Sequence, residues 1–132
     1  MSLPERVTLE FETFWQQRRL ATLTTIRPDG TPHVVPVGVT IDVATGLARV
    51  ITSATSYKAR HLLAAGPDGG FAAVCQVDGR RWSTLEGRAV VRSDPAAVAD
   101  AERRYAERYR VPRVNPRRVV IEIQVSRVLG NV

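Results

Sequence analysis

Residues 20–42 read "LATLTTIRPDGTPHVVPVGVTID", and this stretch decides the fold class. Strand-forming residues lie on both sides of Pro28-Asp29-Gly30, and proline followed by Asp-Gly is typical of a tight reversal. The stretch therefore predicts a β-hairpin. In its second half the bulky apolar residues fall on alternate positions, which predicts one face turned towards a core: Val35, Val37, Val39 and Ile41.

The segments that follow continue the pattern of strands and reversals. Ala44-Thr45-Gly46 predicts a turn into "LARVITS", and Asp78-Gly79 separates the runs "GGFAAVCQV" and "RRWSTLEGRAVVRS". Near the end of the chain, residues 119–125 alternate again. Together these segments predict a mainly β protein, in which about six mostly antiparallel strands form a closed or nearly closed barrel.

Three short helices are predicted beside the strands. The first has a helical stripe of aromatic residues, Phe11, Phe14 and Trp15. Ser56 is expected to cap the second helix, whose inward side is predicted to consist of Ala59, Leu62 and Leu63. Asp94 is expected to cap the third, with a proline at its first position. Since no linker or repeat interrupts the chain, residues 1–132 are expected to form one domain.

The composition narrows the class of partner. The net charge of +6 and the pI near 10.6 favour an anionic partner: nucleic acid, an acidic membrane or a polyanionic small molecule. The basic residues form no known nucleic-acid motif, and no apolar stretch approaches the roughly 20 residues that cross a bilayer. Cys75 lies in an apolar run and is expected to be buried. With no signal peptide recognised, a cytoplasmic protein without nucleic-acid or membrane partners is expected.

The stretch "ITSATSYKARHL", residues 51–62, predicts an anion-binding corner. A helix that begins after Ser56 presents unpaired amides and the positive end of its dipole. Lys58 would add a point charge there, and hydroxyl groups would come from the end of the preceding strand, at Thr52 and Ser53. The alternative is that Ser56 only caps the helix and Lys58 is a solvated surface residue.

Four further features are candidates for a ligand pocket. Small groups at Pro36 and Gly38 would let a flat ligand approach the backbone of the second strand, unless the glycine only curves the strand. His33 is a possible donor or a strand-end residue, and Trp82 can wall a pocket or fill the core. The arginines of "YRVPRVNPRR", residues 109–118, can clamp carboxylates or belong to a solvated loop.

Other kinds of chemistry find little support in the sequence. There is no Ser/His/Asp arrangement, no Cys/His spacing suited to a metal, and no pair of acids in a plausible site. Hydrolytic and metal-dependent reactions are therefore not predicted, no metal is expected, and no catalytic side chain is assigned.

The runs "LATLTTIRPDGTPHVVPVG" and "ARVITSATSYKARHL" resemble the split-barrel superfamily that includes pyridoxamine 5′-phosphate oxidases and deazaflavin-dependent oxidoreductases. The segments "QVDGRRWSTLEGRAVV" and "DAERRYAERYRVPRVNPRRVVIEIQVSRVLG" resemble, more specifically, the biliverdin reductases that depend on coenzyme F420. The resemblance covers nearly the whole chain. It implies a six-stranded split β-barrel of the FMN-binding type, and a homodimer with its cofactor in a groove between the subunits.

The resemblance also implies the residues that hold the cofactor. The phosphate-side motif corresponds to Thr52, Ser53, Ser56 and Lys58, and the stretch against the ring corresponds to Pro36, Val37 and Gly38. His33 and Trp82 match positions near the pocket. The Ser-x-Lys element is shared with enzymes that use flavin mononucleotide (FMN), so it does not distinguish FMN from coenzyme F420.

The implied reaction is hydride transfer from reduced coenzyme F420 to biliverdin, a tetrapyrrole, giving bilirubin. The cofactor would supply the redox step, and the protein would supply positioning and electrostatics. The basic charge suits a coenzyme whose tail is a phosphate followed by several glutamates. Two alternatives stay open: an FMN-dependent enzyme of the pyridoxamine phosphate oxidase type, and a non-catalytic protein that binds a flavin or a tetrapyrrole.

Overall fold

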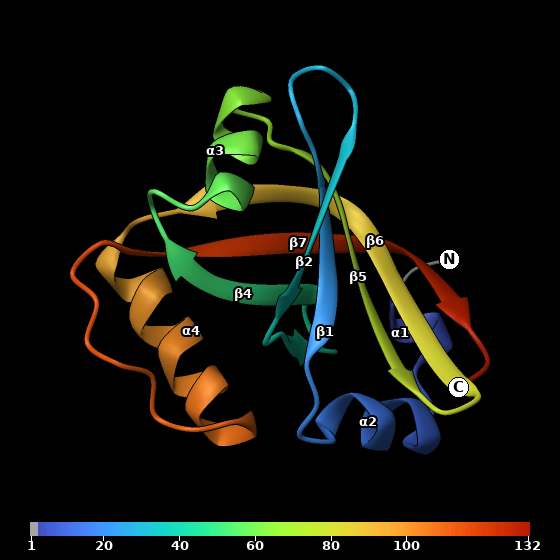
Figure 1. Ribbon diagram of the computed structural model, residues 1–132. Helices are drawn as coiled ribbons and strands as arrows, with labels where there is room; N and C mark the ends of the chain where they lie inside the picture. The colour runs from blue at the N-terminus through green and yellow to red at the C-terminus, as the bar shows by residue number, and fades with distance from the viewer. Residues whose placement is uncertain (1–2) are drawn as a thin grey trace.

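The computed structural model describes residues 3–132 (Figure 1). Within this range lie four helices and seven strands, in the order α1 (Leu3–Arg6), α2 (Leu9–Gln16), β1 (Ala21–Ile26), β2 (Pro32–Val37), β3 (Thr40–Asp42), β4 (Leu47–Ser53), α3 (Tyr57–Ala64), β5 (Gly70–Asp78), β6 (Arg81–Arg92), α4 (Pro95–Arg108) and β7 (Arg118–Gly130). None of these helices is long and apolar enough to cross a membrane.

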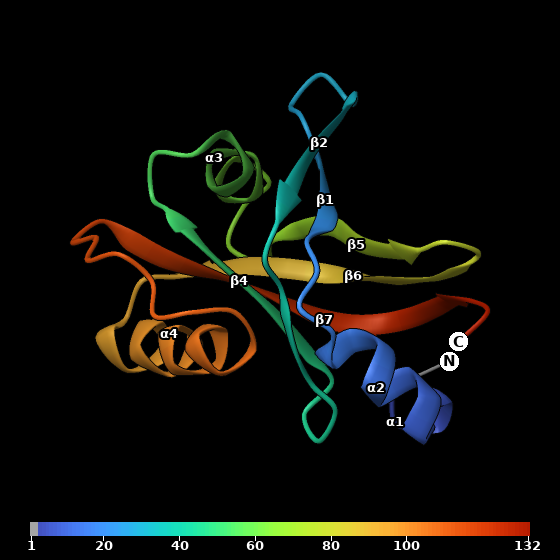
Figure 2. The same ribbon diagram turned by 60° about the horizontal axis from the view of Figure 1, so that its bottom comes forward.

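The seven strands form one antiparallel sheet with the order β2-β1-β5-β6-β7-β4-β3. The two edge strands, β2 and β3, are consecutive in the chain and are joined only by Gly38 and Val39. The chain therefore passes directly from one edge of the sheet to the other, and the curled sheet is nearly closed (Figure 2). The predicted mainly β, split-barrel class is confirmed.

The predicted count of six strands is wrong, because the second predicted strand is broken at its centre. The backbone of Val39 bonds to α4 and not to a neighbouring strand. Its amide donates to the hydroxyl of Tyr109 at 3.2 Å, and its carbonyl accepts from the guanidinium of Arg108. The alternation of Val35 to Ile41 persists through this break, which is why the sequence showed no interruption there.

The predicted turns lie where the sequence placed them. In the β1–β2 hairpin Ile26 pairs with Pro32, and the carboxylate of Asp29 accepts a hydrogen bond from the amide of Thr31 at 3.0 Å. Gly30 has a φ of 87°, a conformation that favours glycine. The turns at 44–46 and 78–79 likewise connect β3 to β4 and β5 to β6.

The core fills the inside of the curled sheet and is closed at one end by α2. The aromatic stripe on α2 is buried as predicted, and the indole of Trp15 donates to the Ser83 hydroxyl at 3.1 Å. Two burial predictions are wrong. Leu63 is 57% exposed, since α3 turns only Ala59 and Leu62 towards the sheet, and Cys75 lies on the half-exposed face of β5.

Two helices flank the carboxyl end of β4. The chain leaves β4 and turns into α3 on one side, while α4 and the loop after it lie on the other side (Figures 1 and 2). Both helices have the predicted caps: Ser56 accepts from the amide of Ala59 at 3.3 Å, and Asp94 accepts from that of Ala97 at 3.2 Å. This arrangement opens a space between α3, α4 and the broken edge strand.

Candidate functional site

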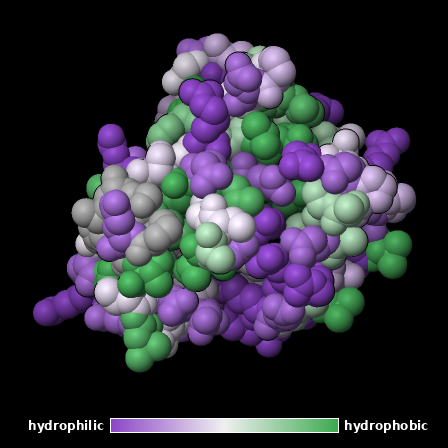
Figure 3. Space-filling model, turned by 180° about the vertical axis from the view of Figure 1, so that it is seen from behind, coloured by the Kyte–Doolittle hydropathy of each residue, from purple (hydrophilic) through white to green (hydrophobic). Residues whose placement is uncertain are grey.

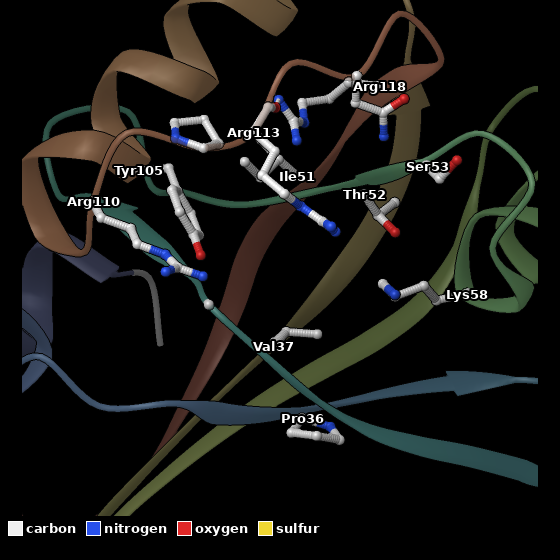
Figure 4. Close-up of a pocket in the computed structure, with 13 residues that line it drawn as sticks. Pro36, Val37, Ile51, Thr52, Ser53, Lys58, Tyr105, Arg110, Arg113 and Arg118 are labelled. Carbon is white, nitrogen blue, oxygen red and sulfur yellow. Dashed lines mark hydrogen bonds between the residues drawn. The ribbon is translucent and has the colours of Figure 1, made fainter.

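A cavity of about 340 Å³ occupies this space (Figure 4). Its wall is formed by Pro36, Val37, Gly38, Ile51, Thr52, Ser53, Lys58, Tyr105, Arg110, Pro112, Arg113, Asn115 and Arg118. Six of the nine residues predicted from the sequence to bind a cofactor are in this wall: Pro36, Val37, Gly38, Thr52, Ser53 and Lys58. The strand with small groups and the Ser-x-Lys corner thus face one common space.

The corner between β4 and α3 supplies several hydrogen-bond donors. Thr52 donates its hydroxyl hydrogen to the hydroxyl of Ser56 at 3.0 Å, and Ser56 uses the same oxygen to cap α3. The first-turn amides of Tyr57 and Lys58 have no acceptor among residues 3–132. Ser56 is not in the cavity wall itself, and it therefore acts by holding Thr52 and the start of the helix in place.

Lys58 enters the cavity from α3 (Figure 4). It is half-buried, and burial lowers the pKa of its ammonium group from the ordinary value for lysine. Among the described side chains it has no acidic partner, and no acidic residue is in the cavity wall. A half-buried cation without a counter-ion, beside free helix amides, is the arrangement that attracts a phosphate group.

The opposite wall is shaped by Gly38 and the end of α4. A Cβ atom at position 38 would lie 2.8 Å from a ring carbon of Tyr105 and 3.1 Å from one of Tyr109. The two tyrosine rings pack on each other with centroids 5.0 Å apart, and Tyr105 faces the cavity. Glycine is therefore needed here for the close approach of a helix, in addition to any role towards a flat ligand.

Arg108 and Tyr109 hold α4 to the break in the edge strand. The guanidinium of Arg108 donates to the carbonyls of Val39 and Gln17, the latter at 2.7 Å, and to the side chain of Gln76 at 2.6 Å. The hydroxyl of Tyr109 donates to the carbonyl of Arg19 at 2.7 Å. Burial lowers the pKa of Arg108, and no carboxylate pairs with it among the described residues. These contacts fix the helix end that precedes the arginine-rich loop.

The loop of residues 110–118 was left without an assigned role by the sequence, and the structure brings it to the cavity. Arg110, Arg113 and Arg118 are all in the wall, together with Asn115 and Pro112. The density of arginine in "YRVPRVNPRR" was the available signal, but sequence spacing alone does not show that a loop near the end of the chain lies opposite α3. Tyr105 and Ile51 were also missed.

His33 lies beside this cavity but is not in its wall. Its ring packs edge-on against His61, with centroids 4.9 Å apart, and His61 Nδ1 is 3.0 Å from the hydroxyl of Thr25. The Nδ1 atom of His33 is buried and has no partner among the described residues. Desolvation, followed by the nearby charges of His61, Arg27 and Lys58, lowers the pKa of His33. These surroundings therefore favour the neutral form of the ring.

Trp82 is far from the cavity within one chain. It lies at the start of β6, next to the end of β7, where Ser83 pairs with Gly130. The cavity lies at the other end of β7, where Arg118 pairs with Ser53. The side chain of Trp82 is 39% exposed, so it fills no core position either. Among the described residues, no group of histidine, cysteine, aspartate and glutamate is suited to hold a metal ion.

Comparisons with known proteins agree with this fold. Residues 7–131 match the family described as pyridoxamine 5′-phosphate oxidase. Over 118 residues the chain is 58% identical to a Mycobacterium tuberculosis protein named F420H2-dependent biliverdin reductase, covering 89% of this chain and 83% of that protein.

Two solved structures illustrate the similarity of the fold. A conserved hypothetical protein of Mycobacterium tuberculosis superposes with a TM-score of 0.77 at 25% identity, covering 94% of this chain and 83% of that one. A protein named F420 reductase superposes with a TM-score of 0.69 at 22% identity, covering 93% of this chain and 98% of that one. At that level of identity the second comparison concerns the fold alone.

Proposed function

Because the chain belongs to the pyridoxamine 5′-phosphate oxidase family, we propose that it is an oxidoreductase that reduces biliverdin to bilirubin with reduced coenzyme F420. The single observation that carries the proposal is the identity of 58% to a protein named for that activity, over 89% of this chain. The chemistry of the cavity agrees with it, as the following residues show.

The cavity meets the needs of a phosphate-bearing deazaflavin. The amides of Tyr57 and Lys58, the lysine ammonium group and the hydroxyl groups of Thr52 and Ser53 are the donors for the phosphate. Pro36, Val37 and Gly38 offer the ring a wall without charged side chains. When bound, the reduced coenzyme supplies the hydride that reduces the central methine of the tetrapyrrole.

The protein's own part is binding and orientation. The N-cap bond of Ser56 and the contacts of Arg108 and Tyr109 fix the two sides of the cavity before any ligand enters. A preformed site of this kind holds two reactants in a reactive orientation without further ordering of the chain. No side chain is assigned here as the proton donor.

The proposal includes a homodimer that completes the groove. Apolar side chains are exposed on the strands away from the core: Val34, Phe71, Val77, Trp82 and Leu129. Figure 3 shows hydrophobic patches among hydrophilic residues on the back of the molecule. Trp82 lies away from the cavity of its own chain, so it can border a cofactor groove only at the cavity of a second subunit. Sedimentation is expected to give a dimer at micromolar concentration, and a monomer with coenzyme present would contradict this part.

The test of the function is anaerobic turnover with a choice of donors. Loss of biliverdin absorbance and appearance of bilirubin are followed with reduced coenzyme F420, reduced FMN and NADPH in turn. We expect turnover with the coenzyme and little with the other two, because neither carries the polyglutamate tail that suits the +6 chain. Oxidation of the coenzyme by other acceptors, but never by biliverdin, would refute the substrate. FMN that co-purifies while coenzyme F420 fails to bind would favour the oxidase-type alternative.

A further inference from the structure

The cavity has two cationic sides, and a phosphate at Lys58 accounts for only one of them. Lys58 and Arg110 project from opposite sides, and Arg113 reaches in from the loop between them (Figure 4). Among the described side chains neither arginine has a carboxylate within ion-pairing distance. By contrast, the third arginine of the loop, Arg118, pairs with Glu102 at 2.7 Å. Two guanidinium groups therefore face a cavity that contains no acidic residue.

The loop brings its aliphatic residues to the surface and two of its arginines to the cavity. A loop that only crosses the surface turns its arginines to water and its aliphatic residues inward. Here Val111 and Val114 are 82% and 98% exposed, and the neighbouring Arg110 and Arg113 are in the cavity wall, where they stay open to solvent. Bringing two unpaired positive charges to one cavity is unfavourable in the chain alone, so it indicates an anionic ligand that offsets this repulsion.

The loop is also held in this shape. Arg118 donates to the carbonyl of Arg113 at 2.7 Å, and the side chain of Asn115 accepts from the amide of Arg117 at 2.9 Å. At its far end the carbonyl of Arg117 accepts from the amide of Ala54 at 2.8 Å, which ties the loop to the segment that carries the phosphate corner. The two cationic sides are thus fixed relative to each other.

We infer that Arg110 and Arg113 form a carboxylate-binding site at the side of the cavity opposite Lys58. The planar guanidinium fork matches the geometry of a carboxylate and binds it with two parallel hydrogen bonds. The site takes carboxylates of a ligand whose remaining part lies against the wall of residues 36–38. The inference rests on the proposed function for the source of these groups, which are the γ-glutamyl tail of the coenzyme or the propionates of the tetrapyrrole.

The test uses charge-removing variants with a matched control. Arg110→Gln, Arg113→Gln and the double variant are compared with Arg117→Gln, which removes the same charge from the same loop. The side chain of Arg117 has no ion pair among the described residues and is not in the cavity wall. The control therefore reports the loss of long-range attraction alone. Urea unfolding checks that all four variants keep the stability of the wild type.

Each variant is measured with two pairs of ligands. The first pair consists of coenzyme F420 with its glutamate tail and the form that retains the phosphate but lacks glutamates. Their affinities are measured by deazaflavin fluorescence. The second pair consists of biliverdin and its dimethyl ester. The KM of each is measured in the turnover reaction. For the source that uses the site, the double variant is expected to weaken the carboxylate-bearing ligand about tenfold or more. The other member of that pair, which lacks the glutamates or has its propionates esterified, and the Arg117→Gln control are expected to change less than about twofold.

The pair that responds identifies the source of the carboxylates. The inference is overturned if the double variant weakens neither carboxylate-bearing ligand, if it weakens both members of each pair equally, or if Arg117→Gln has the same effect as the double variant. If wild-type protein neither binds the coenzyme nor reduces biliverdin, the proposed function fails separately. The site is then measured by direct titration with biliverdin and its dimethyl ester, and equal affinity for the two, or binding of neither, would overturn it.

Discussion

Arg108 and Arg110 lie two residues apart in the chain and have opposite surroundings. Arg108 is half-buried, and its guanidinium donates to two backbone carbonyls and a glutamine side chain. Arg110 is exposed at the cavity, and no ion pair or hydrogen bond is formed by its side chain among the described residues. Arg108 donates to acceptors within the chain that would otherwise lack a hydrogen bond. Arg110 keeps its hydrogen-bond donors available for a ligand.

The same contrast applies to larger parts of the molecule. Around Arg108, Tyr109 and Gln76 the polar groups are paired, so this region holds the broken edge strand in place. In the cavity the charges of Lys58, Arg110 and Arg113 are unpaired, and no acidic residue is in the wall. Paired polar groups indicate a structural role, and unpaired ones mark the place where a ligand binds. The predictions below test that distinction.

The largest effect is expected from Arg108→Leu. The substitution removes one donor from each of the carbonyls of Gln17 and Val39, and it leaves the side-chain oxygen of the buried Gln76 without its donor. The two carbonyls keep weaker or local partners, the amide of Arg19 and the hydroxyl of Tyr109. Each such loss costs about 1–3 kcal/mol, so the free energy of unfolding should fall by roughly 3 kcal/mol or more. Urea unfolding measures it. The matched variant Arg110→Leu should change stability by less than about 0.5 kcal/mol, and equal losses in the two would remove the distinction.

The next effect concerns binding and not stability. Lys58→Ala should weaken coenzyme binding by about 1.5–3 kcal/mol through loss of a charge-assisted contact, and the loss should shrink as salt screens the charges. Fluorescence titration at two ionic strengths measures both effects. Arg60→Ala is the control, since Arg60 is on the same helix but is exposed and packs on Tyr57. An unchanged affinity at low salt would show that Lys58 is a surface residue that does not contribute to coenzyme binding.

A smaller effect is expected from Gly38→Ala. The added methyl group would lie within 3.1 Å of both tyrosine rings, so the rings must shift, at a cost of about 1–2 kcal/mol in the free energy of unfolding. The same substitution in a Tyr105→Ala background removes the closer contact and should be less destabilising, which a double-mutant cycle measures. Strict additivity of the two changes would show that Gly38 is not needed for the approach of α4.

The smallest effect is a pH dependence of stability at His33. Its folded-state pKa lies below the ordinary histidine pKa of 6.5, so the native state resists protonation more than the unfolded chain does. The corresponding stability is complete above pH 6.5 and is lost as the pH falls from there through the folded-state pKa. Urea unfolding of wild type and His33→Gln at pH 7.5 and pH 5 measures the difference. A variant that loses as much stability as the wild type on acidification would contradict this assignment.

The sequence predicted those parts of the fold that depend on local patterns. Turn residues such as Asp29-Gly30, the caps Ser56 and Asp94, and the aromatic stripe of α2 act within a few residues of themselves, so their positions could be stated in advance. The break at Val39 could not, because it is caused by side chains about 70 residues later in the chain. A seventh strand results from that one long-range contact.

The candidate site also has a part that local sequence predicts and a part that depends on contacts distant in the chain. The corner at Ser56 and Lys58 is local, and the sequence alone indicated its chemistry. The arginine loop faces that corner only because β4 and β7 pair, with Ser53 opposite Arg118. His33 and Trp82 were candidates from their places in the sequence as well as from the resemblance. Neither is in the cavity wall of a single chain, so their roles towards a cofactor stay predictions.

A crystal structure of the protein with coenzyme F420 tests the central claim most directly. We expect the phosphate within hydrogen-bonding distance of the Lys58 ammonium group and of the hydroxyl groups of Thr52 and Ser53, with the ring against residues 36–38. A coenzyme bound elsewhere, such as in the groove between His61 and Phe71 on the other side of α3, would contradict it. In that case the unpaired cations of the cavity would not mark the binding site.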